Sequence, residues 1–110
     1  RGLGDVYKRQ QYAAVITDNS EGSDPYRLHV YRSDGSQVFE RAFTYQYSGF
    51  DIDGDLVLLY NDNSCRVYNM AGTEKFNGTF DFSVSKISAG SLPGTLLVMG
   101  PQKIQEIRMR

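Results

Sequence analysis

The chain has 110 residues, with 12 basic and 13 acidic side chains and a formal net charge of −1 at pH 7. Nucleic-acid binding requires basic side chains gathered on one surface, and the sequence has no such cluster, so we expect no nucleic-acid partner. No apolar run reaches the roughly 20 residues of a membrane-spanning helix. The single cysteine, Cys65, excludes an internal disulfide and a thiolate zinc site.

The first ten residues, RGLGDVYKRQ, correspond to a translation of the transposase end of a sequencing adapter. We therefore expect residues 1–10 to be non-native and leave them out of the fold prediction. They contain three basic residues and one acidic residue, so the remainder is more acidic than the whole chain. On this interpretation residues 11–110 are a fragment, and the natural protein continues upstream of Gln11.

From residue 11 onward, short segments rich in Val, Ile, Leu, Phe and Tyr alternate with clusters of Gly, Asp, Asn and Ser. Helical periodicity is nearly absent, so the pattern predicts an all-β chain. The expected strands are residues 12–17, 27–32, 37–43, 47–52, 55–61, 65–69, 74–80, 84–89, 95–99 and 103–109.

A long polar segment, NSEGSDP, separates the first two expected strands, where the later repeat has only a short Asp62-Asn63-Ser64 turn. Loops on a rigid scaffold often carry function, which makes this segment a candidate binding loop. A solvated extension of a hairpin is the alternative. The candidate binding residues are Asn19, Glu21, Ser23, Asp24 and Tyr26.

The chain repeats itself. Residues 28–35, LHVYRSDG, align with residues 65–72, CRVYNMAG, at an offset of 37. In a third copy, residues 55–59 align with 95–99 at an offset of 40, and residues 65–70 align with 104–109 at an offset of 39. Repeats of about 40 residues, each with four short strands, are typical of β-propeller blades.

The repeat predicts a partial β-propeller with about two and a half four-stranded antiparallel blades, near residues 11–53, 54–91 and 92–110, the last one incomplete. We expect tight hairpins at Gly35 and Gly72, and we expect Asp53-Gly54 to join one blade to the next. The remaining blades of the full-length chain are the expected partners. In closed propellers an N-terminal segment often supplies the missing strands of the last blade.

The sequence FDIDGDL places Asp51, Asp53 and Asp55 at alternate positions, as in a calcium loop. The spacing does not continue as an EF-hand, because Leu56 and Asp62 stand where the glycine and the bidentate glutamate belong. We therefore expect an acidic turn between blades, with no metal and no cofactor, and we keep these aspartates as the only calcium candidates.

No catalytic residue is expected. His29 is the sole histidine and aligns with Arg66, which indicates an exposed strand position, and no GxSxG motif occurs. Cys65 aligns with apolar residues and is expected to be buried. Aromatic residues that recur at the repeat offset are expected to pack between blades rather than bind sugars or bases: Phe39, Phe43, Tyr45, Tyr47, Phe76, Phe80 and Phe82.

The segments SDPYRLHVYRSDGSQVF, VYNMAGTEKF and GPQKIQEIRMR resemble a bacterial family, domain of unknown function 5711. The resemblance covers residues 11–110 and implies the C-terminal part of a membrane-anchored propeller displayed outside the cytoplasm, after a basic N-terminus and one helix. It provides no catalytic residue to carry over.

Together these observations predict a non-catalytic propeller, not an enzyme, that serves as a scaffold or binding module of a bacterial membrane-anchored protein. Its ligand would be a protein or a glycan. The alternative is a calcium-dependent carbohydrate-binding or glycan-processing propeller whose active residues lie in the upstream blades.

Overall fold

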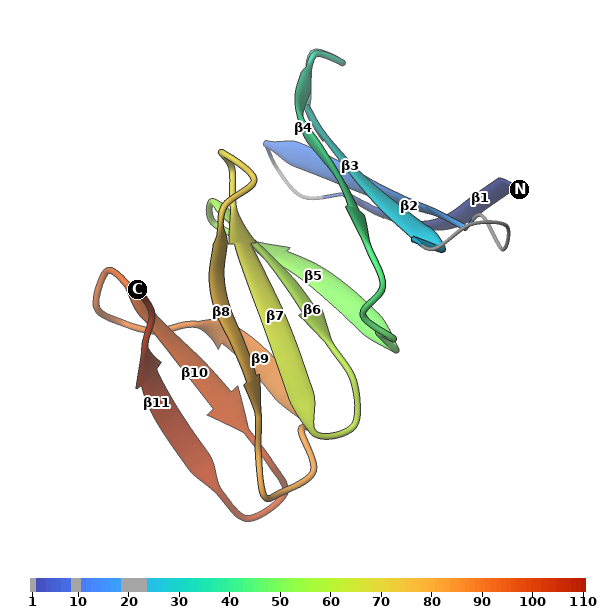
Figure 1. Cartoon of the computed structure of the whole chain (residues 1–110). Coiled ribbons are helices and arrows are strands. Elements are labelled where there is room, and N and C mark those ends of the chain that lie inside the picture. The colour runs from blue at the N-terminus through green and yellow to red at the C-terminus, as the bar shows by residue number, and fades with distance from the viewer. Residues whose placement is uncertain (1, 9–10, 19–23) are drawn as a thin grey trace. The chain divides into compact units, whose positions relative to one another are not determined.

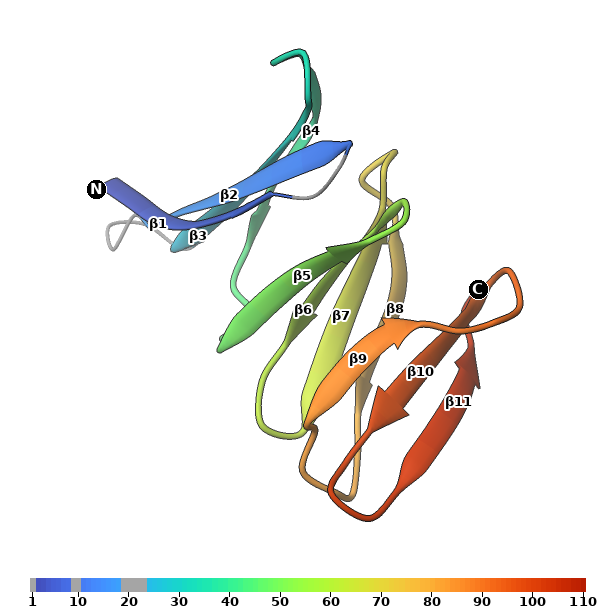
Figure 2. The ribbon, with the colours of Figure 1, turned by 180° about the vertical axis from the view of Figure 1, so that it is seen from behind.

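The computed structural model describes residues 2–8, 11–18 and 24–110, and the described residues are all-β (Figures 1 and 2). Nothing in this part of the chain is a helix suited to cross a membrane. The strands are β1 (Gly2–Lys8), β2 (Tyr12–Asp18), β3 (Tyr26–Arg32), β4 (Gln37–Phe43), β5 (Gly49–Asp53), β6 (Leu56–Tyr60), β7 (Ser64–Asn69), β8 (Glu74–Thr79), β9 (Lys86–Ala89), β10 (Thr95–Met99) and β11 (Ile104–Arg108).

These strands form three antiparallel sheets in which neighbours in sequence are neighbours in space. The first sheet has the order β1-β2-β3-β4, the second β5-β6-β7-β8 and the third β11-β10-β9. The chain divides into two compact units, Arg1–Gln46 with Met70–Gly72, and Tyr47–Asn69 with Thr73–Arg110. The second unit therefore contains every strand of the second and third sheets, and only the β7–β8 turn, Met70–Gly72, belongs to the first unit.

The all-β prediction is confirmed, and each of the ten expected segments contains a strand. The eleventh strand, β1, lies in the residues that were left out of the fold prediction. It pairs with β2 from Gly2 opposite Asp18 to Lys8 opposite Ala13. The non-native origin of residues 1–10 stays a prediction.

Glycines with positive φ close equivalent hairpins of the first two sheets. Gly35 has φ 90° in the β3–β4 turn, and Gly72 has φ 82° in the β7–β8 turn. Both angles lie in the left-handed region that favours glycine. The expectation that Asp53-Gly54 joins two blades is wrong, because β5 pairs with β6 and Asp53 stands opposite Leu56. A sequence repeat has no intrinsic starting point, and a boundary drawn at residue 53 cuts through this hairpin.

The register of β10 also differs from the expected alignment. Val57 pairs with Tyr68 in the second sheet, and Leu96 pairs with Ile107 in the third. Val57 and Leu96 therefore occupy equivalent positions at an offset of 39, not 40. Side chains on a strand alternate between the two faces of a sheet. The one-residue difference therefore puts every β10 residue on the face opposite to the one that the expected alignment assigns to it. The continuous apolar run of residues 56–59 has no alternation from which the register could be read.

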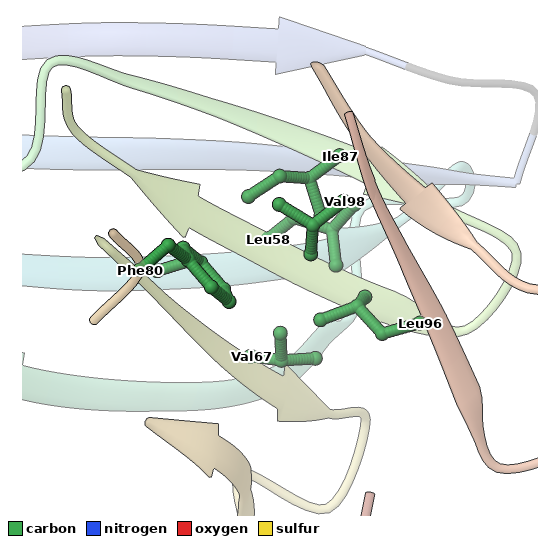
Figure 3. Close-up of a cluster of buried hydrophobic side chains, with 7 residues drawn as sticks. Leu58, Val67, Phe80, Ile87, Leu96 and Val98 are labelled. Atoms are coloured by element: carbon green, nitrogen blue, oxygen red, sulfur yellow. The ribbon is translucent and has the colours of Figure 1, made fainter. Parts of the chain in front are cut away.

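The second and third sheets pack through their apolar faces in the second unit (Figure 3). The second sheet contributes Leu58, Cys65 and Val67 to this core, and the third contributes Ile87, Leu96 and Val98. The connection between β8 and β9 adds further side chains at alternate positions, Phe80, Phe82 and Val84. The packing role expected for the aromatic residues is confirmed for Phe76, Phe80 and Phe82.

We predict that Leu96→Ala lowers the free energy of unfolding by about 2–5 kcal/mol, because it leaves a cavity in this core. Leu92→Ala is the matched control, since Leu92 is 61% exposed whereas Leu96 is 0% exposed. The control is expected to change stability by less than about 0.5 kcal/mol. Urea unfolding measures both, and equal losses would contradict the sheet-on-sheet core.

Candidate functional site

The candidate binding loop lies mostly outside the described residues, which omit 19–23. Of its remaining members, Asp24 is exposed and Tyr26 begins β3. The Tyr26 hydroxyl donates a hydrogen bond to Gln46 Oε1 at 3.3 Å, and its ring stacks on Phe43 with centroids 5.3 Å apart. Tyr26 thus makes packing contacts within the first unit, and a binding role for Asn19, Glu21 and Ser23 stays a prediction.

The three candidate calcium ligands, Asp51, Asp53 and Asp55, lie in different structural environments. Asp51 and Asp53 share one face of β5, whereas Asp55 is exposed in the β5–β6 turn. Asp53 Oδ2 accepts a hydrogen bond from the Ala89 backbone N–H at 2.8 Å, which ties β5 to β9 of the neighbouring sheet. Across residues 11–18 and 24–110 no group of three or more carboxylate, histidine or cysteine side chains is placed to hold a metal ion.

His29 belongs to a polar cluster on one face of the first sheet. Its side chain is 18% exposed, so the expectation of an exposed position is wrong. His29 Nε2 lies 3.3 Å from Thr17 Oγ1, and Nδ1 lies 4.0 Å from Glu40 Oε1. Arg27 Nη1 donates to Glu40 Oε2 at 2.8 Å. These cross-strand neighbours enclose the imidazole, which the repeat alignment with Arg66 alone does not reveal.

The hydrogen bonds of this cluster run between neighbouring strands of the first sheet. The Thr17 hydroxyl donates to the Arg27 carbonyl oxygen at 3.4 Å. The tautomer of the imidazole decides whether His29 Nε2 donates to Thr17 Oγ1 or accepts from it. Glu40 is held by Arg27, and its 4.0 Å separation from Nδ1 is too long for a hydrogen bond.

Cys65 is fully buried in the core of the second unit, as expected. Burial raises the pKa of its thiol to about 12. The thiolate is the nucleophilic form of cysteine, and desolvation disfavours it. Cys65 therefore acts as a small apolar side chain.

An open cleft of about 450 Å³ lies in the second unit between β8 and β11. We call it the β8–β11 cleft. Phe76 and Phe80 line it from the second sheet and its following connection, and Gln105 and Ile107 line it from β11. The Phe76 and Phe80 rings stack with centroids 6.2 Å apart. Phe80 belongs to the apolar core between the second and third sheets, and Phe76 packs against that core.

Two charged side chains, Asp81 and Lys103, also line this cleft. Lys103 Nζ lies 3.3 Å from Asp81 Oδ1 and 5.2 Å from the centroid of the Phe82 ring. Both Lys103 and Asp81 are more than half exposed, so this ion pair contributes little to stability. The sequence did not predict the cleft, because β8 and β11 belong to different sheets and no spacing in the chain joins them.

We predict that Asp53→Ala lowers the free energy of unfolding by about 1–3 kcal/mol, because it removes the acceptor of the half-buried Ala89 N–H. Asp55→Ala is the matched control and is expected to change stability by less than about 0.5 kcal/mol, since Asp55 is exposed. Chemical denaturation measures both. If the two variants lose the same stability, Asp53 has no tethering role.

We also predict that the Cys65 thiol resists alkylation by iodoacetamide at pH 8 in the folded chain and reacts in urea. The reaction requires that iodoacetamide reach the sulfur and that the thiol be ionised. Burial of Cys65 blocks the reagent and disfavours the thiolate. Mass spectrometry of the alkylated chain measures the extent. Rapid alkylation without denaturant would show that the core around β7 is open.

Comparison with known families matches residues 3–109 to the Family of unknown function (DUF5711). The match includes most of residues 1–10 as well as all three sheets. No curated protein and no solved structure matched the chain. The matched segment spans nearly the whole sequence, and the chain therefore belongs to the DUF5711 family.

Proposed function

We propose that the chain is part of a β-propeller that acts as a non-catalytic binding or scaffolding module of a membrane-anchored bacterial protein. One observation carries the proposal: the same antiparallel meander recurs along the chain, and successive sheets of the second unit pack through apolar faces. Propeller blades have this strand order and this mode of packing.

The outer face of the third sheet supports a further blade at this position. Leu97 and Ile104 occupy places equivalent to Leu58 and Cys65, which are buried in the second sheet. Ile104 is 67% exposed. Glu106 stands where the second sheet has Val67, so a blade packed here would meet a partly polar surface. Exposed apolar side chains clustered on one surface are typical of interaction sites.

Structural roles of the reactive side chains support the non-catalytic part of the proposal. The Asp53 carboxylate joins two sheets, the Cys65 thiol is buried with a raised pKa, and His29 Nε2 lies 3.3 Å from Thr17 Oγ1. Each of these groups is used within the β-structure. The membrane anchor rests on the family resemblance alone.

Single-particle imaging of the natural full-length protein tests the architecture. We expect a closed ring of blades that includes the three sheets described here. An open stack of sheets, or a two-sheet sandwich, would contradict the propeller.

Calcium and glycan titrations distinguish the module from the calcium-dependent alternative. We predict that millimolar Ca²⁺ shifts Tm no more than the same concentration of Mg²⁺. A bound ion at 100 times its Kd stabilises a folded protein by about 2.7 kcal/mol, which thermal unfolding readily detects. A Ca²⁺-specific rise in Tm that Asp51→Asn abolishes, together with Ca²⁺-dependent glycan binding, would favour the alternative.

A further inference from the structure

Another open cleft lies in the first unit, at the end of the first sheet where β2 begins and β3 ends. Its volume is about 270 Å³, and it is lined by Gln11, Tyr12, Arg32, Ser33 and Asp34. We call it the β2–β3 cleft. Sites for drug-sized ligands have volumes of about 300–1,000 Å³, so this cleft has room for one small ring. Its lining residues all follow residue 10, so the cleft does not include the segment that we expect to be non-native.

Backbone hydrogen bonds hold the walls of the β2–β3 cleft in place. The Ser33 N–H donates to the Gln11 carbonyl oxygen at 3.0 Å, and the Gly35 N–H donates to the Arg32 carbonyl oxygen at 2.9 Å. Tyr12 stands opposite Arg32 in the β2–β3 ladder. Side chains of directly opposite residues project from the same face of a sheet. An aromatic ring and a guanidinium are therefore neighbours on one wall of the cleft.

Asp34 contributes a carboxylate whose position is fixed by the β3–β4 turn. Its Oδ1 accepts hydrogen bonds from the Ser36 backbone N–H at 2.9 Å and from the Ser36 hydroxyl at 2.7 Å. These bonds, the backbone one above all, hold the pKa of Asp34 below its ordinary value. The group is therefore charged at neutral pH. Within the described residues Oδ2 makes no hydrogen bond, so this oxygen can accept one from a ligand.

Arg32 contributes donors beside this acceptor. Its side chain is exposed, and it forms no ion pair or hydrogen bond with another residue in the described part of the chain. Its positive charge is close enough to Asp34 to help lower the pKa of that carboxyl, although the two side chains do not pair with each other. The cleft thus presents a guanidinium and a carboxylate oxygen that can both bind a third group.

This combination of side chains selects the class of ligand. An anion such as phosphate would be repelled by the Asp34 carboxylate, and a metal cation would be repelled by the Arg32 guanidinium. A hydroxyl group can donate to a carboxylate and accept from a guanidinium, so neighbouring hydroxyls suit both side chains at once. A pyranose sugar carries hydroxyls around its edge and C–H groups on its faces. Its C–H face can pack on an aromatic ring such as that of Tyr12.

We propose that the β2–β3 cleft binds one neutral hexose unit of a glycan, without a metal ion. One face of the sugar packs on Tyr12, and adjacent hydroxyls form hydrogen bonds with Asp34 Oδ2 and the Arg32 guanidinium. This inference rests on the proposed binding module, for which it names a site and a class of ligand. The site belongs to the first unit alone, so its test does not depend on whether the blades close into a ring.

The probes are methyl α-D-glucopyranoside, methyl α-D-mannopyranoside and methyl β-D-galactopyranoside, each titrated into the whole 110-residue chain. In ¹H–¹⁵N NMR spectra we expect at least one of them to shift the backbone amides of Tyr12, Ser33 and Asp34 until the site is saturated. The amides of the third sheet should not shift, and EDTA should leave the affinity unchanged. If none of the three sugars gives saturable shifts at these amides, the proposal is wrong.

Substitutions in the cleft test the role of each group. Tyr12→Leu should weaken sugar binding by about fivefold or more, because it removes the flat ring, whereas Tyr12→Phe should bind within about twofold of the original chain. Asp34→Asn should weaken binding by about tenfold or more, since it replaces a charged acceptor with an amide that can still bond to Ser36. Asp55→Asn is the matched control, because Asp55 is exposed in the β5–β6 turn outside the cleft.

Two further results would overturn the proposal. One is unchanged sugar affinity in folded Tyr12→Leu and Asp34→Asn chains. The other is saturable binding of inorganic phosphate or Ca²⁺ at the same amides in place of the sugars. Imaging of the natural protein keeps the two proposals apart: a closed ring without sugar binding contradicts the glycan site alone, and an open stack of sheets that binds sugar contradicts the propeller alone.

Discussion

Sheet-on-sheet packing is the constraint on which the rest of this structure depends. A strand such as β6 carries apolar side chains on both faces, and Val57, Leu58 and Leu59 are all fully buried. A single sheet has no means to shield both of its faces from water, so each sheet needs a neighbour. In the second unit the third sheet covers the face that carries Leu58, and the connection that contains Phe80 fills the space left between the sheets.

The polar chemistry of the chain follows from this architecture. Asp53 lies at the end of β5, where the backbone of β9 comes close enough to donate a hydrogen bond to its carboxylate. Cys65 fills an apolar position on β7, and the same burial that stabilises the core suppresses ionisation of its thiol. His29 lies among cross-strand neighbours, with its Nε2 3.3 Å from Thr17 Oγ1. An open cleft remains in the second unit, between β8 and β11.

Local signals were sufficient to predict the strands and the glycine turns, because alternation and positive φ at Gly35 and Gly72 act over a few residues. The register of β10 was not predictable from the repeat. Residues 56–59 of β6 are all apolar, so they lack the alternation of apolar and polar residues that would have fixed the alignment of β6 with β10. The β5–β6 hairpin was mistaken for a connection between blades for a related reason, as the repeat does not reveal where a hydrogen-bonded sheet begins. The β8–β11 cleft arises only after two sheets pack, and no local pattern encodes it.

A double-mutant cycle on Leu58→Ala and Ile87→Ala tests the sheet-on-sheet packing most directly. The two side chains come from β6 and β9, strands of different sheets that contact each other, and both belong to the core shown in Figure 3. Residues in contact show coupling energies of about 0.5–3 kcal/mol, whereas distant residues are additive to within about 0.5 kcal/mol. We predict a coupling energy within the first range from urea unfolding of the four proteins. Strict additivity would contradict the packing of the second sheet on the third.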